Sequence, residues 1–511
     1  MTTLSYPCDS TPEIPEGHYS RLCRREKGDW EEHDPDQLEA LASEMKDSPE
    51  KRKARANRRT SITTMPSGYV YFGQFIDHDI TRDNRELDKA VPSVEEIHNF
   101  RTARLDLDSV YGKVPATVPC IYGEDGERLK LGPTLPAKCV DGTPIAWSLN
   151  DLPRTDKGVP VLIDPRNDEN LIVAQLHVLF AKFHNRALEL IRNQPELSPE
   201  PPTSFLERTR RFVTWHYQWL VINDFLPLIA REAVLNDIKG PGSKPRLFER
   251  WYTPADAPVS LPVEFTAAAF RFGHSTVRGE YDLNDCIGGV RSSKIIRMTK
   301  RGRGITTHLP ANYVISWRKF LYGLPAELNL AAEIDTFINE MLYDLPKQTE
   351  EAFRFQSQLR VADFPPGAKM IPPLPETTLK RGSKMRLPSG EEFAKHFKYD
   401  VIDPALLFPE QKEFFESGLK KRTPLWYYLL REAVVEPNSE PPIAGLQLQK
   451  LGTIGSRIVA ETLYQLLHAD RQSIFHEGRG WKPPPFTFGP AGRRWRIRSM
   501  SDLARFVEFR P

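Results

Sequence analysis

Apolar residues recur at three- and four-residue steps over two long stretches in the middle of the chain. The first stretch contains Ile172, Leu176, Leu179, Phe183, Ala187 and Leu190, and the second contains Phe212, Trp215, Trp219, Ile222, Leu226 and Ile229. This spacing gathers apolar side chains on one face of a helix, so each stretch is predicted to be a long helix with one buried face. Similar spacing returns at residues 458–467, whereas strand-like alternation is scarce. We therefore expect a mainly α-helical protein.

No change in composition marks a boundary between two large domains. Residues 1–60 are polar and are predicted to form an N-terminal extension, residues 61–500 a single domain, and residues 501–511 a C-terminal tail. Residues 236–262 and 362–392 are rich in proline, glycine and basic residues and lack sustained periodicity. They are predicted to be long loops around the helical body.

The charge balance gives no support to a polyanion-binding protein. Over 511 residues, 70 basic and 68 acidic side chains leave a net charge of +2, so no whole-protein field favours nucleic acid. Residues 51–59 are a local exception with a basic run. This run is interpreted as a solvated helix face or a mobile arm, and contact with an anionic partner stays open as the alternative, although no aromatic residues interleave with the charges.

The ends of the chain and its cysteines bear on localisation. The N-terminus shows no basic segment followed by an apolar core, and no apolar run approaches a membrane span. Five cysteines are odd in number and lack Cys-x-x-Cys spacing, which fits reduced thiols in the cytosol. A bridge between Cys120 and Cys139 stays open, as does export by a leaderless route.

Chemistry-bearing residues crowd into residues 71–81, which read YFGQFIDHDIT. An apolar frame raises the cost of unpaired polar groups, so Gln74, Asp77, His78 and Asp79 each need a dedicated partner. Among the other histidines, His274 stands apart because it follows a glycine and aromatic residues at 270–273. That glycine lets a planar group approach closely. The histidines at 177, 184 and 216 lie within helical patterns and are interpreted as core or surface residues.

Residues 71–81 closely resemble the distal-side haem motif of the animal-type haem peroxidase (peroxidase-cyclooxygenase) superfamily. The resemblance continues in order through residues 177–186, 224–227 and 387–390, and covers roughly residues 65–470. It implies the haem peroxidase fold, a b-type haem, hydrogen peroxide with a small-molecule electron donor, and a role in the response to oxidative stress. Few cysteines and the absence of animal-style appendages suggest a bacterial-type member.

The resemblance also implies roles for individual residues. The distal acid–base, its hydrogen-bonding partner and the distal arginine would be His78, Gln74 and Arg166. The haem would be held by His274 as iron ligand, by Asp77 and Glu169 through ester links, by Arg271 and Arg381 near its propionates, and by Thr378 as the acceptor for the proximal imidazole. Such an arrangement supplies one axial imidazole and one unligated base, which peroxide cleavage needs.

A calcium site is expected beside the distal histidine. Side-chain oxygens of Thr102, Asp106 and Asp108, with the carbonyl of Arg104, match the family's calcium loop, and Asp79 would complete the site. Calcium favours several oxygen ligands. Taken alone, a short Asp-x-Asp segment is more often a turn or a solvated face.

Three positions depart from the family pattern. Asn170 stands where the chloride-oxidising member has a methionine linked to haem, so phenols, iodide, bromide or thiocyanate are the expected donors. Thr378 stands where many members have an asparagine, which alters the tuning of the iron. Arg271 stands where lipid dioxygenases carry a radical-forming tyrosine. A fatty-acid dioxygenase and a non-catalytic binding protein with the same fold remain the alternatives.

Overall fold

The fold is seen in a computed structural model. It describes residues 17–23, 32–51, 65–83, 97–112, 119–145, 150–197, 204–239, 260–299, 307–344, 373–409, 418–436, 448–489 and 492–509. Of the basic run at 51–59, only Lys51 falls among these residues, and its Nζ donates to Glu44 at 3.1 Å. The rest of that run lies outside the described residues.

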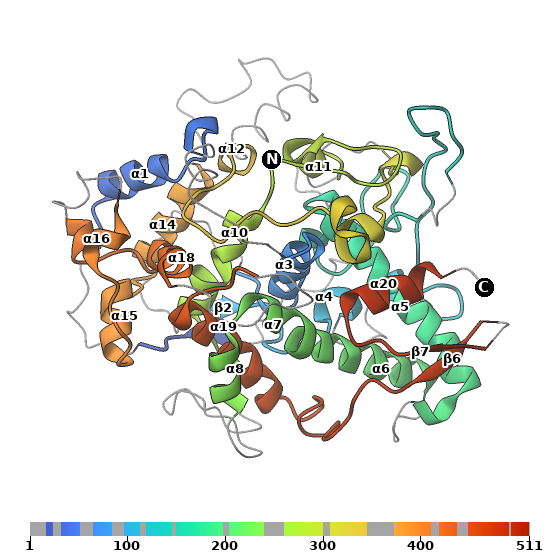
Figure 1. Ribbon diagram of the computed structural model, residues 1–511. Coiled ribbons are helices and arrows are strands. Elements are labelled where there is room, and N and C mark those ends of the chain that lie inside the picture. Colours follow the sequence, from blue (N-terminus) through green and yellow to red (C-terminus); the bar gives the residue numbers. More distant parts are fainter. Residues whose placement is uncertain are drawn as a thin grey trace.

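Helices dominate the described residues (Figure 1). The α-helices are α1 (Pro35–Glu44), α3 (Gly68–Ile80), α4 (Asp108–Tyr111), α5 (Leu171–Asn193), α6 (Phe205–Leu220), α7 (Leu226–Ile229), α8 (Glu232–Lys239), α9 (Val263–Ala267), α10 (Gly273–Thr276), α11 (Ser292–Arg297), α12 (Glu340–Tyr343), α14 (Leu374–Lys384), α15 (Gly390–His396), α16 (Pro404–Leu407), α18 (Leu425–Val435), α19 (Thr453–Ala469) and α20 (Met500–Glu508). The 3-10 helices are η3 (Pro119–Ile121), η4 (Pro165–Asp168), η5 (Pro195–Leu197), η7 (Ala269–Phe272), η8 (Ala311–Tyr313), η10 (Pro325–Glu327) and η12 (Gly418–Lys420), and the π-helical turns are η6 (Val221–Phe225) and η9 (Arg318–Tyr322). The predicted mainly α-helical fold is confirmed.

Among the described residues, short strands pair into three small sheets. The strands are β1 (Gly17–Ser20), β2 (His98–Asn99), β3 (Leu261–Pro262), β4 (Glu280–Tyr281), β5 (Val290–Arg291), β6 (Phe486–Phe488) and β7 (Arg493–Trp495). The three-stranded sheet has the order β2-β1-β3, with β1 antiparallel to β2 and parallel to β3. The pairs β4-β5 and β6-β7 are antiparallel hairpins.

Helix α3 lies near the centre of the molecule, and α5 and α6 pack around it (Figure 1). Phe75 on α3 stacks on Phe180 of α5 with ring centroids 5.0 Å apart, and both meet Tyr217 of α6 edge-on. Both predicted long helices are confirmed. The second is interrupted by the π-helical turn η6, because Pro227 has no N–H and its ring crowds the preceding turn.

Several predicted boundaries differ from the structure. Helix α1 buries Leu38 and Leu41 in the same core as α3, so the polar extension before residue 60 contributes to the domain. Helix α20 buries Leu503 and Phe506 against the main core, so residues 501–509 are not a free tail. Within the predicted loop 362–392, α14 and the start of α15 are helical. These short helices carry few apolar residues among many charges, which hides their periodicity.

The cysteine expectation also needs correction. Cys139 and Cys286 form a disulfide across 147 residues of sequence, with Cα atoms 4.7 Å apart. The open alternative of a Cys120–Cys139 bridge is therefore wrong. Since disulfides persist in oxidising environments, the argument from reduced thiols to the cytosol no longer holds. None of the described helices has the length and apolar character needed to cross a bilayer.

The burial of α20 predicts a large cost for truncating Phe506. Its side chain is 0% exposed and its ring contacts those of Phe183, Phe486 and Trp495. We expect Phe506→Ala to lower the free energy of unfolding in urea by about 3–5 kcal/mol. The control Phe205→Ala removes a ring that is 41% exposed and should change it by about 0.5 kcal/mol or less. Equal small effects would show that α20 is a dispensable tail.

Candidate functional site

A cavity of about 620 Å³ brings most of the predicted site residues together. Its wall is built from β1, α3, η4, η7, α10, α11 and α14. The predicted residues that line it are Gln74, Asp77, His78, Arg166, Glu169, Arg271, His274 and Arg381. Its size lies within the range of sites that hold small molecules or cofactors. Beside His274, an added Cβ on Gly273 would meet nothing within 4 Å, so this part of the wall is open.

His78 is fixed by a chain of hydrogen bonds behind the cavity wall. Its Nδ1 lies 3.0 Å from Oδ1 of Asn167, and Nδ2 of Asn167 lies 3.1 Å from Nδ1 of His177. An amide oxygen only accepts and an amide nitrogen only donates, so this assignment has His78 protonated at Nδ1. Its Nε2, 3.7 Å from Oε2 of Glu169, then carries the lone pair. Burial and the charge of Arg166 lower the pKa of His78, which keeps the imidazole neutral near pH 7.

Arg166 is anchored by Asp164. Its Nε and Nη2 donate to the Asp164 carboxylate at 3.0 and 2.8 Å, and Nη2 also donates to the carbonyl of His78 at 2.8 Å. Burial opposes ionisation of Asp164, but Arg166 and Arg101 outweigh it and hold the pKa of this carboxyl well below its usual range. Arg166 and Glu169 both line the cavity, and the ion pair of Arg166 is with Asp164.

The polar residues around His78 interlock. Nε2 of Gln74 donates to Glu169 at 3.4 Å, while its Oε1 accepts from Nδ2 of Asn170 at 3.1 Å. Asn170 also accepts from the Val173 amide and so caps α5. The Thr81 hydroxyl lies 3.1 Å from the carboxylate of Asp77. Every predicted residue of this wall therefore has a partner, as the apolar frame requires.

His274 has a different environment. Its Nδ1 is buried without a hydrogen-bond partner among the described residues, and its ring meets Trp426 edge-on at 5.9 Å. Burial and the charge of Arg271 lower its pKa to about 3. The expected acceptor Thr378 does not line the cavity; its hydroxyl donates to the Leu374 carbonyl at 2.9 Å, within its own helix. A hydroxyl that donates to the preceding turn can still accept a hydrogen bond, so the acceptor role of Thr378 stays a prediction.

Two arginines complete the wall near His274. Nε of Arg271 donates to the Thr266 carbonyl at 2.9 Å, and Nη2 of Arg381 lies 3.1 Å from Asp83. Guanidinium groups bind carboxylates in a planar, bidentate manner. This part of the cavity is therefore suited to an anionic edge of a ligand.

The predicted calcium residues gather on the far side of α3. Asp79 accepts from the amides of Leu107 and Ser109 at 3.1 and 3.2 Å, and Thr102 donates to Asp106 at 2.9 Å. Leu107 adopts φ 59°, a left-handed conformation that bends the loop. Burial raises the pKa of Asp79 to about 7 and that of Asp106 well above its usual range.

The fit of this loop to a cation is mixed. Oδ1 of Asp108 is buried without a partner among the described residues, and Asp106 lies close enough to Asp79 and Asp108 for their charges to raise its pKa, while Arg101 pairs with Asp108 at 3.3 Å. Buried charges of one sign favour a cation. Within the part of the chain that the structure describes, however, no group of three or more His, Cys, Asp or Glu side chains has metal-binding spacing. Arg104 has an exposed side chain, so only its carbonyl could serve.

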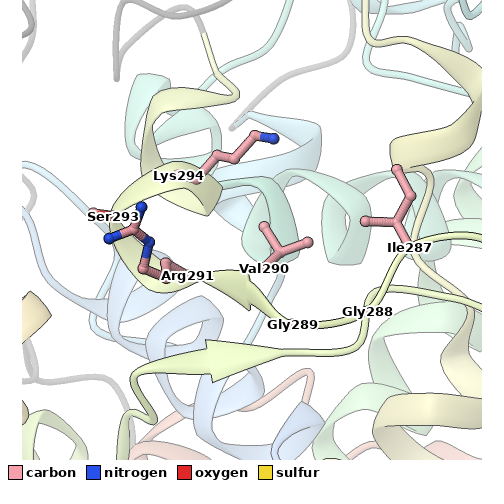
Figure 2. Close-up of a pocket in the computed structure, with 7 residues that line it drawn as sticks. All are labelled: Ile287, Gly288, Gly289, Val290, Arg291, Ser293 and Lys294. Atoms are coloured by element: carbon pink, nitrogen blue, oxygen red, sulfur yellow. The ribbon is translucent and has the colours of Figure 1, made fainter. Parts of the chain in front are cut away.

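A second hollow, of about 440 Å³, lies over the turn between β4 and β5 and the start of α11. Figure 2 shows its labelled residues, which include the cations Arg291 and Lys294. Lys294 donates to the hydroxyl of Tyr313 at 2.9 Å. No residue of the predicted site lines this hollow, so we place the candidate chemistry in the larger cavity.

Sequence reasoning missed the residues that hold the site from behind. Asn167 lies beside Arg166 in the chain, and His177 was interpreted as a core or surface residue because it lies within a helical pattern. Asp164 precedes the segment that carried the motif. The sequence signal that could have found Asn167 and Asp164 is an amide or carboxylate one or two positions from a predicted site residue, here Arg166.

Known proteins resemble this chain over part of its length. A sequence profile described as "Animal haem peroxidase" matches residues 82–355, a range that includes Arg166, Glu169 and His274. A peroxidase-like protein of Margaritifera margaritifera is 25% identical over 259 residues, or 42% of this chain and 32% of that protein. Heme peroxidase 2 of Caenorhabditis elegans is 26% identical over 190 residues, 35% of this chain and 24% of that protein.

Solved structures show the same fold. Peroxidase A from Dictyostelium discoideum has a TM-score of 0.52 at 15% identity, covering 92% of this chain and 89% of its own. The fatty acid alpha-dioxygenase of Oryza sativa has a TM-score of 0.52 at 15% identity, covering 88% and 74%. The chain spans about a third or less of the curated sequence relatives that it matches. None of these matches supports the expected bacterial type.

The hydrogen bond from His78 to Asn167 predicts a tautomer that can be measured. In Asn167→Leu, Nδ1–H of His78 loses its acceptor, so 15N NMR of labelled histidine should show mixed tautomers in place of one. Leaving this buried donor unpaired should also cost about 1–3 kcal/mol of stability. Asn193→Leu, at an exposed asparagine, should leave the His78 resonances alone. Unchanged His78 resonances in Asn167→Leu would contradict the assignment.

Proposed function

Because the chain belongs to the animal haem peroxidase family, we propose that it binds a b-type haem in the cavity and uses hydrogen peroxide to oxidise small organic donors or easily oxidised halides and pseudohalides. The single observation that carries this proposal is the presence of two unlike imidazoles in one cavity. His78 is held at Nδ1 with its Nε2 unprotonated, whereas His274 has no described partner at Nδ1. One imidazole is suited to move a proton and the other to bind iron.

The cavity residues fit this cofactor. His274 would hold the iron, and Arg271 and Arg381 would pair with the propionates. When bound, the haem supplies the iron that takes up the oxidising equivalents of peroxide. Among the described residues Nδ1 of His274 has no acceptor, and we propose that this imidazole donates less electron density to the iron than one bonded to an amide or carboxylate.

His78 and Arg166 would handle the proton and the charge. Nε2 of His78 takes the proton from hydrogen peroxide and returns it to the oxygen that leaves as water. The lowered pKa suits this task, because the imidazole starts as a free base at neutral pH. Arg166 keeps its positive charge at any working pH and would stabilise the negative charge that develops as the two peroxide oxygens separate. Gln74 orders the polar wall between them.

Donor choice and covalent attachment form the finer part of this proposal. Asn170 offers no sulfur for a link to haem, which favours donors such as phenols, iodide, bromide and thiocyanate over chloride. Asp77 and Glu169 both line the cavity, which supports our proposal that their carboxylates form ester links to the haem. We also propose that calcium binds Asp79 with the 102–108 loop, supported by the orphaned oxygen of Asp108.

A fatty-acid dioxygenase is the second candidate. It is supported by the structural likeness to the rice enzyme and by apolar residues such as Ile295, Ile296 and Leu342 in the cavity wall. Arg271, three positions before His274, disfavours it because a radical-forming tyrosine is expected there. Oxygen uptake with an unsaturated fatty acid, in the absence of peroxide, separates the two functions. A haem-free protein that binds polyanions in a salt-sensitive manner would instead support the non-catalytic alternative.

Substitution of the two histidines tests the proposal. His78→Ala should bind haem with a normal Soret band but react with hydrogen peroxide about 10²–10⁴-fold more slowly in stopped flow, because the proton carrier is gone. His274→Ala should lose the haem or shift its Soret band, because the iron loses its ligand. The exposed His396→Ala is the matched control and should behave as the unmodified chain.

The pH dependence of the reaction with peroxide is a second test of the role of His78. The pKa of His78 is lowered, so its base form persists to pH values below the ordinary histidine range. The rate of reaction with peroxide should therefore be flat near neutral pH and fall only under acid conditions, as the imidazole gains a proton. This acid limb should be missing in His78→Ala. A rate that is unchanged in His78→Ala would contradict the assignment.

Extraction tests the ester links separately. Acid–organic solvent should fail to remove haem from peroxide-treated protein, because an ester survives unfolding. The variant Asp77→Asn with Glu169→Gln should release its haem fully, as judged by the absorbance of the organic phase. Complete release from the unmodified chain would leave both carboxylates as ordinary polar neighbours.

A further inference from the structure

Two exposed histidines face each other across the small sheet at the N-terminal end of the described chain. His18 of β1 is directly opposite His98 of β2 in the antiparallel register, and both are exposed. The amide of Tyr19 donates to the Ile97 carbonyl at 3.2 Å, so Tyr19 and Ile97, the next pair along the two strands, are a hydrogen-bonded pair. His18 and His98 therefore form a non-hydrogen-bonded pair, where side chains on adjacent strands come closest.

The separation of the two rings matches that of imidazoles sharing a metal. Their centroids are 4.8 Å apart and their planes are inclined by 49°. With metal–nitrogen bonds of about 2.0–2.1 Å, a shared cation lies about 3.2 Å from each centroid. An angle of about 90–110° at the metal then puts the centroids about 4.5–5.2 Å apart. The ring of His98 is also held edge-on by Phe100 at 6.5 Å.

Other roles for these rings find no support in the described residues. Neither imidazole makes a hydrogen bond or an ion pair there, so their nitrogens are available to a ligand. Both side chains are exposed, so a core-packing role does not explain their contact. Neither residue lines the large cavity, which separates this pair from the proposed haem site.

We propose that His18 and His98 chelate a divalent cation of the zinc, nickel or copper class, with water in the remaining coordination positions. Imidazole nitrogen is a favoured ligand of these metals, whereas calcium and magnesium favour oxygen. With two protein ligands the site leaves coordination positions open, and it has fewer protein ligands than the three or four of most resident zinc centres. The cation joins β1 to β2 through their side chains.

The position of His18 and His98 links the proposed metal site to the wall of the large cavity. Tyr19 follows His18 in β1 and lines the large cavity, and β1 is the central strand of its sheet. Just beyond β1, the buried carboxylate of Glu264 accepts from the amides of Leu22 and Cys23 at 3.1 and 3.0 Å. Bound metal therefore braces one side of a strand that is already anchored on the other, and stiffens this wall of the cavity.

Zinc titration tests the site on the full-length, haem-loaded chain, in which haem would fill the cavity that His78 and His274 line. Calorimetry with Zn²⁺ alone should show one site in the unmodified protein. His18→Ala and His98→Ala should each weaken it at least tenfold, and the double variant should be no weaker than either, because one imidazole alone does not chelate. His396→Ala removes an exposed histidine that pairs with no other histidine among the described residues and should change nothing.

Hydrogen exchange locates the cation independently of the affinity. Zn²⁺ should slow exchange of the Tyr19 amide in the unmodified protein and leave it unchanged in His18→Ala, with circular dichroism showing that the variant is folded. The proposal is overturned by full affinity in either single variant, by an equal loss in His396→Ala, or by exchange at Tyr19 that ignores zinc. None of these results depends on peroxidase activity.

Discussion

The carboxylate of Asp164 holds two guanidiniums, those of Arg101 and Arg166, within a largely water-free region behind the cavity. Through Arg166 it reaches the backbone carbonyls of His78 and Thr81, where α3 ends. Through Arg101 it reaches Asp108 in the loop beyond α3. Removing one partner of a buried ion pair costs about 3–5 kcal/mol, because the other charge is left uncompensated. The end of α3, the arginine of the site and the acidic loop are therefore fixed together.

Helix α3 divides its residues between two tasks. Gln74, Asp77 and His78 follow the i, i+3, i+4 spacing of one helix face and line the cavity. Phe75 and Asp79 lie on another face, where the ring packs against α5 and the carboxylate binds the backbone of the 102–108 loop. A helix in the middle of the protein has buried surroundings on every side. This explains why so many polar groups in one short segment each have their own partner.

The sequence was sufficient for the parts of the fold that depend on local periodicity and for residues carried by a family motif. The long helices α5 and α6 have enough apolar positions to be recognised, and the motif residues of α3, η4 and α10 converge on one cavity. Helix α14 was missed because few apolar positions stand among its proline and charges. Helix α20 has a buried apolar face, but its nine residues at the end of the sequence are too few to show a sustained repeat.

Contacts between distant segments were beyond sequence reasoning. The disulfide joins Cys139 to Cys286, and the bond between His78 and Asn167 spans 89 residues, so neither leaves a local pattern. The local bond of Thr378 is different, since its hydroxyl donates to the preceding turn of its own helix, while Nδ1 of His274 has no partner among the described residues. Motifs identify which residue types meet in a site, whereas the residues that hold them in place depend on the folded chain.

The most direct test of the account is the visible spectrum of the purified, haem-supplied protein before and after hydrogen peroxide is added. The account predicts a Soret band that changes on addition of peroxide and returns when a phenolic donor is supplied. A bound haem that ignores peroxide, or a protein that takes up no haem, would contradict it.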